Sequence, residues 1–185
     1  MLFIPDISGF TELVHSVDVL TGKQITYELL SAVMSQNLLN LNVSEVEGDA
    51  VLFYRYGPVP TVNELMQQYS AMMKAFEAKR AALEESLGHS LHLALKIIAH
   101  YGAITEYQIG PFKKLYGEVV VDAHRLLKNA IQSNSYLLLT DALLQQSTLH
   151  ENEAQTANKL CEVSGNRSLC FSYFDFAKEE LQRVA

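Results

Sequence analysis

The chain opens with the stretch Leu2-Phe3-Ile4-Pro5-Asp6-Ile7-Ser8-Gly9-Phe10-Thr11. Its apolar run is typical of a buried strand, and apolar residues at helical spacing follow over about 9–17. The stretch therefore predicts a strand that delivers the Asp6 carboxylate to a strand-to-helix turn. Such a turn is suited to holding a metal ion or a phosphate, because free backbone N–H groups gather there. The plainer alternative is that Asp6 only caps the helix.

A second stretch predicts a tight β-hairpin, with strands over about 41–47 and 49–56. Asp49 directly follows Gly48, the glycine expected in the turn. If this hairpin lies beside the first strand, Asp6 and Asp49 can share one hard divalent cation. Mg²⁺ prefers oxygen ligands and usually takes one or two carboxylates from the protein. The alternative is that Asp49 is a solvated turn residue.

The length of 185 residues and an ordinary composition predict a single domain over 1–185 with its own core. The formal net charge is −7 and the chain has no basic cluster, which disfavours nucleic acid as the main partner. No apolar run reaches the roughly 18 residues of a membrane span. The first residues also lack the basic region of a signal peptide. We therefore expect a cytoplasmic protein without a membrane partner.

The two cysteines, Cys161 and Cys170, match no metal-binding spacing. Because nothing in the chain suggests secretion, we expect them to be free buried thiols. If both lie on adjacent strands, however, they can face each other.

Turn and cap residues divide the rest of the chain. Thr61 followed by Glu64 is a capping-box pattern that predicts a long helix ending at Gly88. The Thr21-Gly22 pair is expected to break the first helix pattern before a second helix begins near residue 23, and Gly102 is expected to turn one strand back onto its partner. The further expected elements are helices over about 23–37, 62–87, 118–131 and 141–147, strands over about 91–100, 103–109, 136–139, 158–164 and 169–176, and a polar loop over about 148–157.

This order, β-αα-ββ-α-ββ-α-β-α-ββ, consists mainly of hairpins separated by helices. It predicts an α+β fold with one mixed or antiparallel sheet covered by helices.

The segment over 113–128 is the other informative stretch, because a glycine opens a helix that carries Arg125 among apolar residues. A partly buried arginine that points into a cleft is a natural clamp for phosphate. The equally supported alternative is that Arg125 pairs with a structural acid. We expect His100 and His124 to be hydrogen-bonded structural residues.

Four segments together resemble the catalytic domain of class III nucleotide cyclases. Phe3–Thr11 resembles the opening metal-binding motif of that family, and Glu47–Ala50 resembles its second, a hairpin ending in Gly-Asp. Leu95–Gly102 resembles the family's strand ending in His-x-Gly. Tyr116–Leu126 resembles its segment Gly-x-x-Val-Asn-x-Ala-x-Arg-Leu. The matches occur in the family's order. In their amino-acid sequences, the first, second and fourth segments more closely resemble DUF2652, a bacterial family of unknown function related to those cyclases.

The resemblance implies a ferredoxin-like (βαββαβ) core that forms a head-to-tail homodimer and binds a nucleoside triphosphate with two Mg²⁺ or Mn²⁺ ions. The resemblance implies that the metal ligands are Asp6, Asp49 and the backbone carbonyl of Ile7. It also implies that Arg125 is catalytic, because it would stabilise charge on the transferring phosphoryl group. The residues implied to contact the phosphates are Gly9, Phe10, Thr11 and Arg167.

The base-reading half of the resemblance departs from the family. The base-reading lysine falls at Glu45, the base-reading acid at Lys114, and the ribose-orienting asparagine at Val121. Glu45 and Lys114 can form an ion pair or read a different group, and Val121 cannot donate a hydrogen bond. The sequence therefore supports two main functions: a divergent cyclase that releases pyrophosphate, or a catalytically inactive homology domain that binds a nucleotide or other small ligand and signals through its dimer. A third alternative, a purely structural dimerisation module, leaves the paired acids unexplained.

Overall fold

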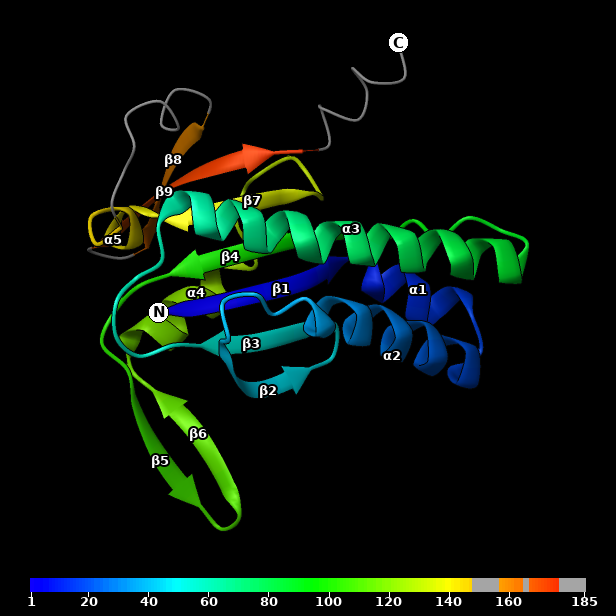
Figure 1. Cartoon of the computed structure of the whole chain (residues 1–185), viewed down its shortest axis with the longest axis horizontal. Helices are drawn as coiled ribbons and strands as arrows, with labels where there is room; N and C mark the ends of the chain where they lie inside the picture. Colours follow the sequence, from blue (N-terminus) through cyan, green and yellow to red (C-terminus); the bar gives the residue numbers. More distant parts are fainter. Residues whose placement is uncertain (148–156, 165–166, 177–185) are drawn as a thin grey trace.

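The structure is a computed structural model that describes residues 1–147, 157–164 and 167–176, without the side chains of Ser164 and Arg167. Helices and strands alternate in small groups along the chain (Figure 1). In chain order the elements are β1 (Leu2–Ser8), α1 (Phe10–Ser16), α2 (Val19–Ser35), β2 (Asn42–Glu47), β3 (Ala50–Tyr54), α3 (Val62–Leu87), β4 (Ala94–His100), β5 (Thr105–Ile109), β6 (Phe112–Tyr116), α4 (Glu118–Leu126), β7 (Tyr136–Thr140), α5 (Asp141–Leu144), β8 (Asn158–Ser164) and β9 (Arg167–Asp175).

The main sheet has seven strands in the order β2-β3-β1-β4-β7-β9-β8. Its first four strands are antiparallel neighbours, with α1 and α2 between β1 and β2, and α3 between β3 and β4. This is the βαββαβ arrangement of a ferredoxin-like core. Strand β7 extends it in parallel beside β4, and β9 and β8 follow as antiparallel strands. The expected α+β class and mixed sheet are confirmed.

Helices α2 and α3 cover one face of this sheet, and α4 lies on the other (Figure 1). The first face buries Phe3 and Ile7 of β1 against the apolar stripe of α3. The expected capping box starts α3: Glu64 N donates to Thr61 Oγ1 at 3.2 Å, and Thr61 N donates to the Glu64 carboxylate at 2.7 Å. Within the described residues, no helix is long and apolar enough to cross a membrane.

The opposite face of β1 carries Leu2, Ile4 and Asp6, because side chains alternate along a strand. Leu2 and Ile4 pack with Val119 and Ala123 of α4. Asp6 lies two residues further along the strand, and its side chain keeps an exposed fraction of 13%. The fold thus places one acid directly after two buried apolar residues on the same strand face.

Helix α2 does not break at Thr21-Gly22, so that expectation is wrong. The helix begins earlier, because the Asp18 carboxylate accepts hydrogen bonds from the backbone N–H groups of Leu20 and Thr21. Gly22 then lies within the first turns, where a strong N-cap outweighs the modest cost of a glycine.

The segment over 103–109 was expected to pair with the strand before it, and this is also wrong. Strand β4 already has β1 and β7 as neighbours. Strand β5 instead pairs with β6 in a separate hairpin that projects from the body, with Gly110 in its turn at φ 56° (Figure 1). Lys113 and Lys114 therefore lie on a strand and not in a loop.

Several elements are shorter than the sequence patterns indicated. Helix α4 ends at Leu126 and not near 131, because the Asn129 side chain donates to the Leu126 carbonyl and accepts from Ile131 N. Strand β4 begins at Ala94, and α5 ends at Leu144. Most of the polar loop expected over 148–157 lies outside the described residues.

The cysteines form a disulfide, so the expectation of free buried thiols is wrong. Cys161 and Cys170 are directly opposite each other in the antiparallel pair β8–β9, and Cys161 is exposed. The structure has the alternative arrangement, in which adjacent strands bring the two sulfurs together.

His100 is a structural histidine, as expected. It ends β4 with an exposed fraction of 4%, and its Nδ1 lies 2.9 Å from Thr140 Oγ1. Burial lowers the pKa of the imidazole from 6.5 to about 4, although the nearby charge of Asp122 acts in the opposite direction.

This shift predicts a specific loss of stability in mild acid. Between pH 6.5 and about 4 the unfolded chain protonates His100 and the folded chain does not, so the free energy of unfolding falls as the pH falls. From pH 7 to pH 5 we expect a loss of about 2 kcal/mol from this residue. Urea unfolding of the protein and of His100→Gln at both pH values measures the difference. Equal losses in the two proteins would contradict the prediction.

Candidate functional site

Asp6 lies on the central strand of the ferredoxin-like core, opposite Ala50 of β3 and Lys96 of β4. Directly opposed residues of an antiparallel pair share one face of the sheet. Accordingly, Lys96 Nζ lies 3.3 Å from Asp6 Oδ1, and both side chains are largely buried.

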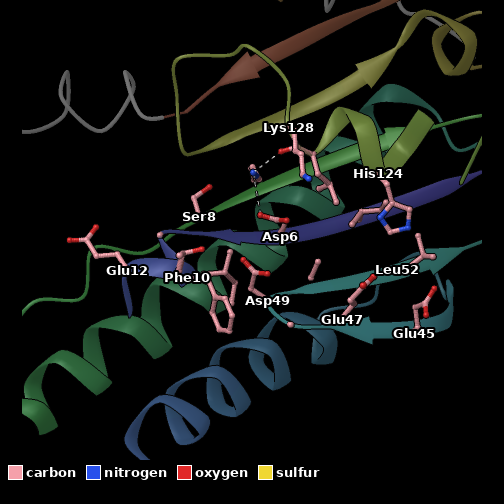
Figure 2. A pocket seen from close by; sticks show the side chains of 18 residues that line it. Asp6, Ser8, Phe10, Glu12, Glu45, Glu47, Asp49, Leu52, His124 and Lys128 are labelled. Carbon is pink, nitrogen blue, oxygen red and sulfur yellow. Dashed lines mark hydrogen bonds and ion pairs between the residues drawn. The ribbon is translucent and has the colours of Figure 1, made fainter. Parts of the chain in front are cut away.

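Asp49 lies in the two-residue turn between β2 and β3. The backbone N–H of Ile7 donates to the Asp49 carbonyl at 3.1 Å, which holds the tip of the hairpin against β1. Asp6 and Asp49 therefore line the same open pocket of about 760 Å³ (Figure 2). The two acids are more than forty positions apart in the sequence and adjacent in the fold.

Both acids of the pocket have raised pKa values. Burial is the main cause for Asp6, the charge of Asp49 adds to the rise, and the Lys96 ammonium acts against it. Burial also raises the pKa of Asp49, while a backbone hydrogen bond and Lys96 act against it. In each carboxylate the charged form is therefore disfavoured by the loss of water, and a bound cation would offset this cost by direct attraction.

The donor set fits a divalent cation of the kind that nucleotides carry. Within the described part of the chain, no group of three or more His, Cys, Asp or Glu side chains is placed to hold a metal ion. Mg²⁺ does not require such a cage, because it usually takes one or two carboxylates and completes its shell with water and substrate phosphates. Asp6, Ile7 and Asp49 line the pocket, and their two carboxylates match that demand.

The start of α1 forms another wall of the pocket, to which Gly9, Phe10 and Thr11 contribute. Gly9 has φ +88°, and a Cβ there would lie 2.3 Å from the carbonyl oxygen of His92. Only glycine allows this close approach, which brings the beginning of α1 beside Asp6.

Of the three departures from the cyclase pattern, only Glu45 lines the pocket. Glu45 forms an ion pair with Lys114, which joins β2 to the projecting β5–β6 hairpin. Of the two alternatives for these residues, the ion pair is therefore formed. Val121 lies on α4 outside the pocket lining, with 66% of its surface exposed.

Arg125 does not line the pocket of its own chain. Its Nη1 lies 3.8 Å from Asp122 Oδ1 on the same helix, so the alternative of a pair with a structural acid is formed within one chain. The side chain of Arg167, expected to contact phosphate, lies outside what the structure describes.

Four charged residues of the pocket lining were not expected from the sequence: Glu12, Glu47, Lys96 and Lys128. Lys96 is the one that contacts Asp6. Its signal was a lone lysine inside the buried strand pattern of Leu95, Ile97 and Ile98. The pocket is also lined by His124 and Lys128, both exposed residues of the α4 region. The role of His124 as a hydrogen-bonded structural residue stays a prediction.

The sequence profile of one protein family, described as protein of unknown function (DUF2652), matches residues 26–136, more than half of the chain. The chain belongs to the DUF2652 family. The match includes Asp49, Lys96 and Arg125 but not the first strand with Asp6. This DUF2652 chain is also 26% identical over 149 residues to the uncharacterized protein Rv2561/Rv2562 of Mycobacterium tuberculosis, covering 76% of the chain and 69% of that protein.

Solved structures of class III nucleotide cyclases share the fold of this DUF2652 chain. The guanylyl cyclase Cya2 has a TM-score of 0.69 at 11% identity over 93% of this chain and 89% of its own. The adenylyl cyclase CyaB from P. aeruginosa has 0.61 at 15%, over 94% and 92%. The catalytic core of a rhodopsin-guanylyl cyclase in complex with ATPalphaS has 0.58 at 16%, over 93% and 92%. At these identities the likeness establishes the fold.

Proposed function

We propose that this chain binds a nucleoside triphosphate together with Mg²⁺ or Mn²⁺ in the pocket around Asp6 and Asp49. We further propose that two copies, arranged head to tail, convert it to a cyclic nucleotide and pyrophosphate. The observation that carries the proposal is the placement of these two acids in one pocket on a nucleotide-cyclase fold. One structural neighbour was solved with ATPalphaS, which supports a nucleotide as the ligand class.

In the proposed reaction the ribose 3′ oxygen bonds to the α phosphorus, and the bond from that phosphorus to the pyrophosphate leaving group breaks. The hydroxyl proton passes to water. Asp6, Asp49 and the Ile7 carbonyl would hold the cation, which supplies positive charge next to the phosphates. Gly9, Phe10 and Thr11 would form the wall beside the triphosphate. The protein's contribution is therefore positioning and charge, not a covalent intermediate.

A second copy of the chain would complete the site. Arg125 lies outside its own pocket, so it is free to face the pocket of a neighbour once its weak pair with Asp122 opens. Its helix and the neighbouring β5–β6 hairpin also expose large apolar side chains, which favours a covered interface over a free surface. These side chains are Tyr107, Ile109, Phe112, Tyr116 and Val121.

A specific observation favours binding without turnover as the second candidate function. Glu45 and Lys114 neutralise each other, so neither side chain is free to read the edge of a base. A nucleotide held only through its phosphates would lack the orientation that cyclisation requires. In that case the chain would act as a nucleotide-responsive dimerisation module.

A combined assay tests the proposal and separates the two candidates. Purified protein is incubated with Mn²⁺ and each nucleoside triphosphate, and pyrophosphate and the melting temperature are measured. Pyrophosphate together with a cyclic product supports the cyclase. A metal-dependent rise in melting temperature without pyrophosphate supports binding alone. Neither response with any of the four triphosphates would contradict both.

A further inference from the structure

Lys96 occupies an unusual position for a lysine, in the middle of a buried strand. Its side chain has an exposed fraction of 18%, and its Nζ is held between two acceptors from different parts of the fold. One is Asp6 Oδ1 at 3.3 Å and the other is the Leu127 carbonyl oxygen at 3.1 Å, at the end of α4 (dashed lines in Figure 2). These contacts place a positive charge at the wall of the pocket.

This ammonium acts on both acids of the site. Its charge opposes the rise in pKa at Asp6, where it also forms a hydrogen bond, and it opposes the rise at Asp49 without direct contact. A buried charge needs a partner, and Asp6 supplies one here. One oxygen of Asp6 is thereby engaged before any metal ion arrives.

We propose that the Lys96 ammonium is a resident cation of this site, so that the pocket takes one divalent metal ion and not the pair that the cyclase resemblance implies. This inference rests on the proposed function, because it concerns the same two acids. Asp49 and the remaining oxygen of Asp6 would hold the single divalent ion.

The charges of Asp6, Asp49 and Lys96, the groups next to the proposed ion, support a single ion. Asp6 and Asp49 together carry two negative charges, and Lys96 already offsets one of them. One divalent ion would make the local sum slightly positive, which triphosphate oxygens can balance. A second divalent ion would have to share Asp6 with the Lys96 ammonium, a few ångströms away. The repulsion between these two positive charges is substantial in a partly buried site.

The experiment measures Mn²⁺ alone, by electron paramagnetic resonance of the free ion during titration. The wild-type protein should bind one Mn²⁺ per chain in a manner that Asp49→Asn abolishes. Lys96→Met removes the ammonium at similar volume and should bind Mn²⁺ about tenfold more tightly or better. Structural damage would lower this affinity, so an increase is specific to the lost charge.

Two further variants control for the change. Lys96→Arg keeps the charge and should retain wild-type affinity. Lys128→Met removes another ammonium from the lining of the same pocket, one for which no contact to Asp6 is found, and should change the affinity less than about threefold. With a non-hydrolysable triphosphate analogue, wild-type protein should show isolated Mn²⁺ signals, whereas Lys96→Met should gain the spin-coupled signal of adjacent ions.

The outcomes separate this inference from the proposed function. Unchanged or weaker Mn²⁺ binding by Lys96→Met, or a spin-coupled pair in the wild-type protein, would overturn the resident-cation role and leave the nucleotide site standing. Absence of any Asp49-dependent Mn²⁺ binding in the wild-type protein would overturn both.

Discussion

Replacing Asp6 and Asp49 together with asparagine should remove metal-dependent triphosphate binding and turnover. We expect a loss of at least about a hundredfold in Mn²⁺ affinity, because the substitution deletes both charged oxygen donors of the site. Pyrophosphate release should fall below detection. Asparagine preserves the volume of each side chain, so the pocket keeps its shape. Mn²⁺ titration and the pyrophosphate assay measure the two effects.

The raised pKa of Asp49 makes the single variant Asp49→Asn informative about folding as well, whereas Asp6→Asn leaves the buried Lys96 ammonium without its carboxylate partner. Burial disfavours the charge of Asp49, so Asp49→Asn alone should unfold at the same temperature as the wild type or higher without metal. Loss of binding in a protein of unchanged stability then reports the site and not the fold.

Glu47→Gln is the matched control, because Glu47 lines the same pocket one residue before the hairpin turn. It should change Mn²⁺ affinity less than about threefold. Equal effects of the control and the double variant would show that overall negative charge, and not the Asp6–Asp49 pair, attracts the metal.

Arg125→Ala should abolish turnover while leaving Mn²⁺ binding intact. The residue lies outside its own pocket and would act on the pocket of the second subunit, where it would stabilise charge on the transferring phosphoryl group. Loss of such an arginine typically costs about a thousandfold or more in rate. Lys23→Ala, a change to an exposed cation of α2 that does not line the pocket, should retain most activity.

Mixing two inactive proteins tests the head-to-tail arrangement. When Arg125→Ala protein exchanges subunits with the Asp6→Asn, Asp49→Asn protein, each mixed dimer regains one site with intact acids and an intact arginine. Random exchange should restore about a quarter of wild-type turnover. If Arg125 acted on the pocket of its own chain, no mixed dimer would contain a complete site. Turnover would then stay at background, which would contradict the head-to-tail arrangement.

The central part of the fold could be predicted from local patterns. The buried strand before Asp6, the Gly48-Asp49 turn and the Thr61 capping box are each determined by neighbouring residues, and the structure has all three. The adjacency of the two acids required one additional inference, that the hairpin pairs with the first strand.

The errors arose where competition between elements decides the outcome. The segment over 105–109 has strand character, but only the completed sheet shows that β4 has no free edge for it. Gly22 breaks a helix pattern, yet the cap at Asp18 starts α2 at Val19, four residues before the start expected near residue 23. The cysteine pair likewise depends on strand register, which spacing alone does not determine.

The candidate site shows the same division. Its acids were evident because Asp6 interrupts an apolar strand pattern and Asp49 directly follows a turn glycine, Gly48. Lys96 was not, because its significance arises only when β1 and β4 are aligned and Asp6 becomes its opposite partner. The ion pair of Glu45 with Lys114 also depends on the β5–β6 hairpin, which was not foreseen.

The most direct measurement is the position of Mn²⁺ by anomalous X-ray diffraction, in crystals grown with the metal and a non-hydrolysable nucleoside triphosphate. The account predicts an anomalous peak at about 2.0–2.5 Å from a carboxylate oxygen of Asp49 and of Asp6, with phosphate oxygens in the same coordination shell. A nucleotide and its metal bound elsewhere on the chain, with no peak between these two acids, would contradict it.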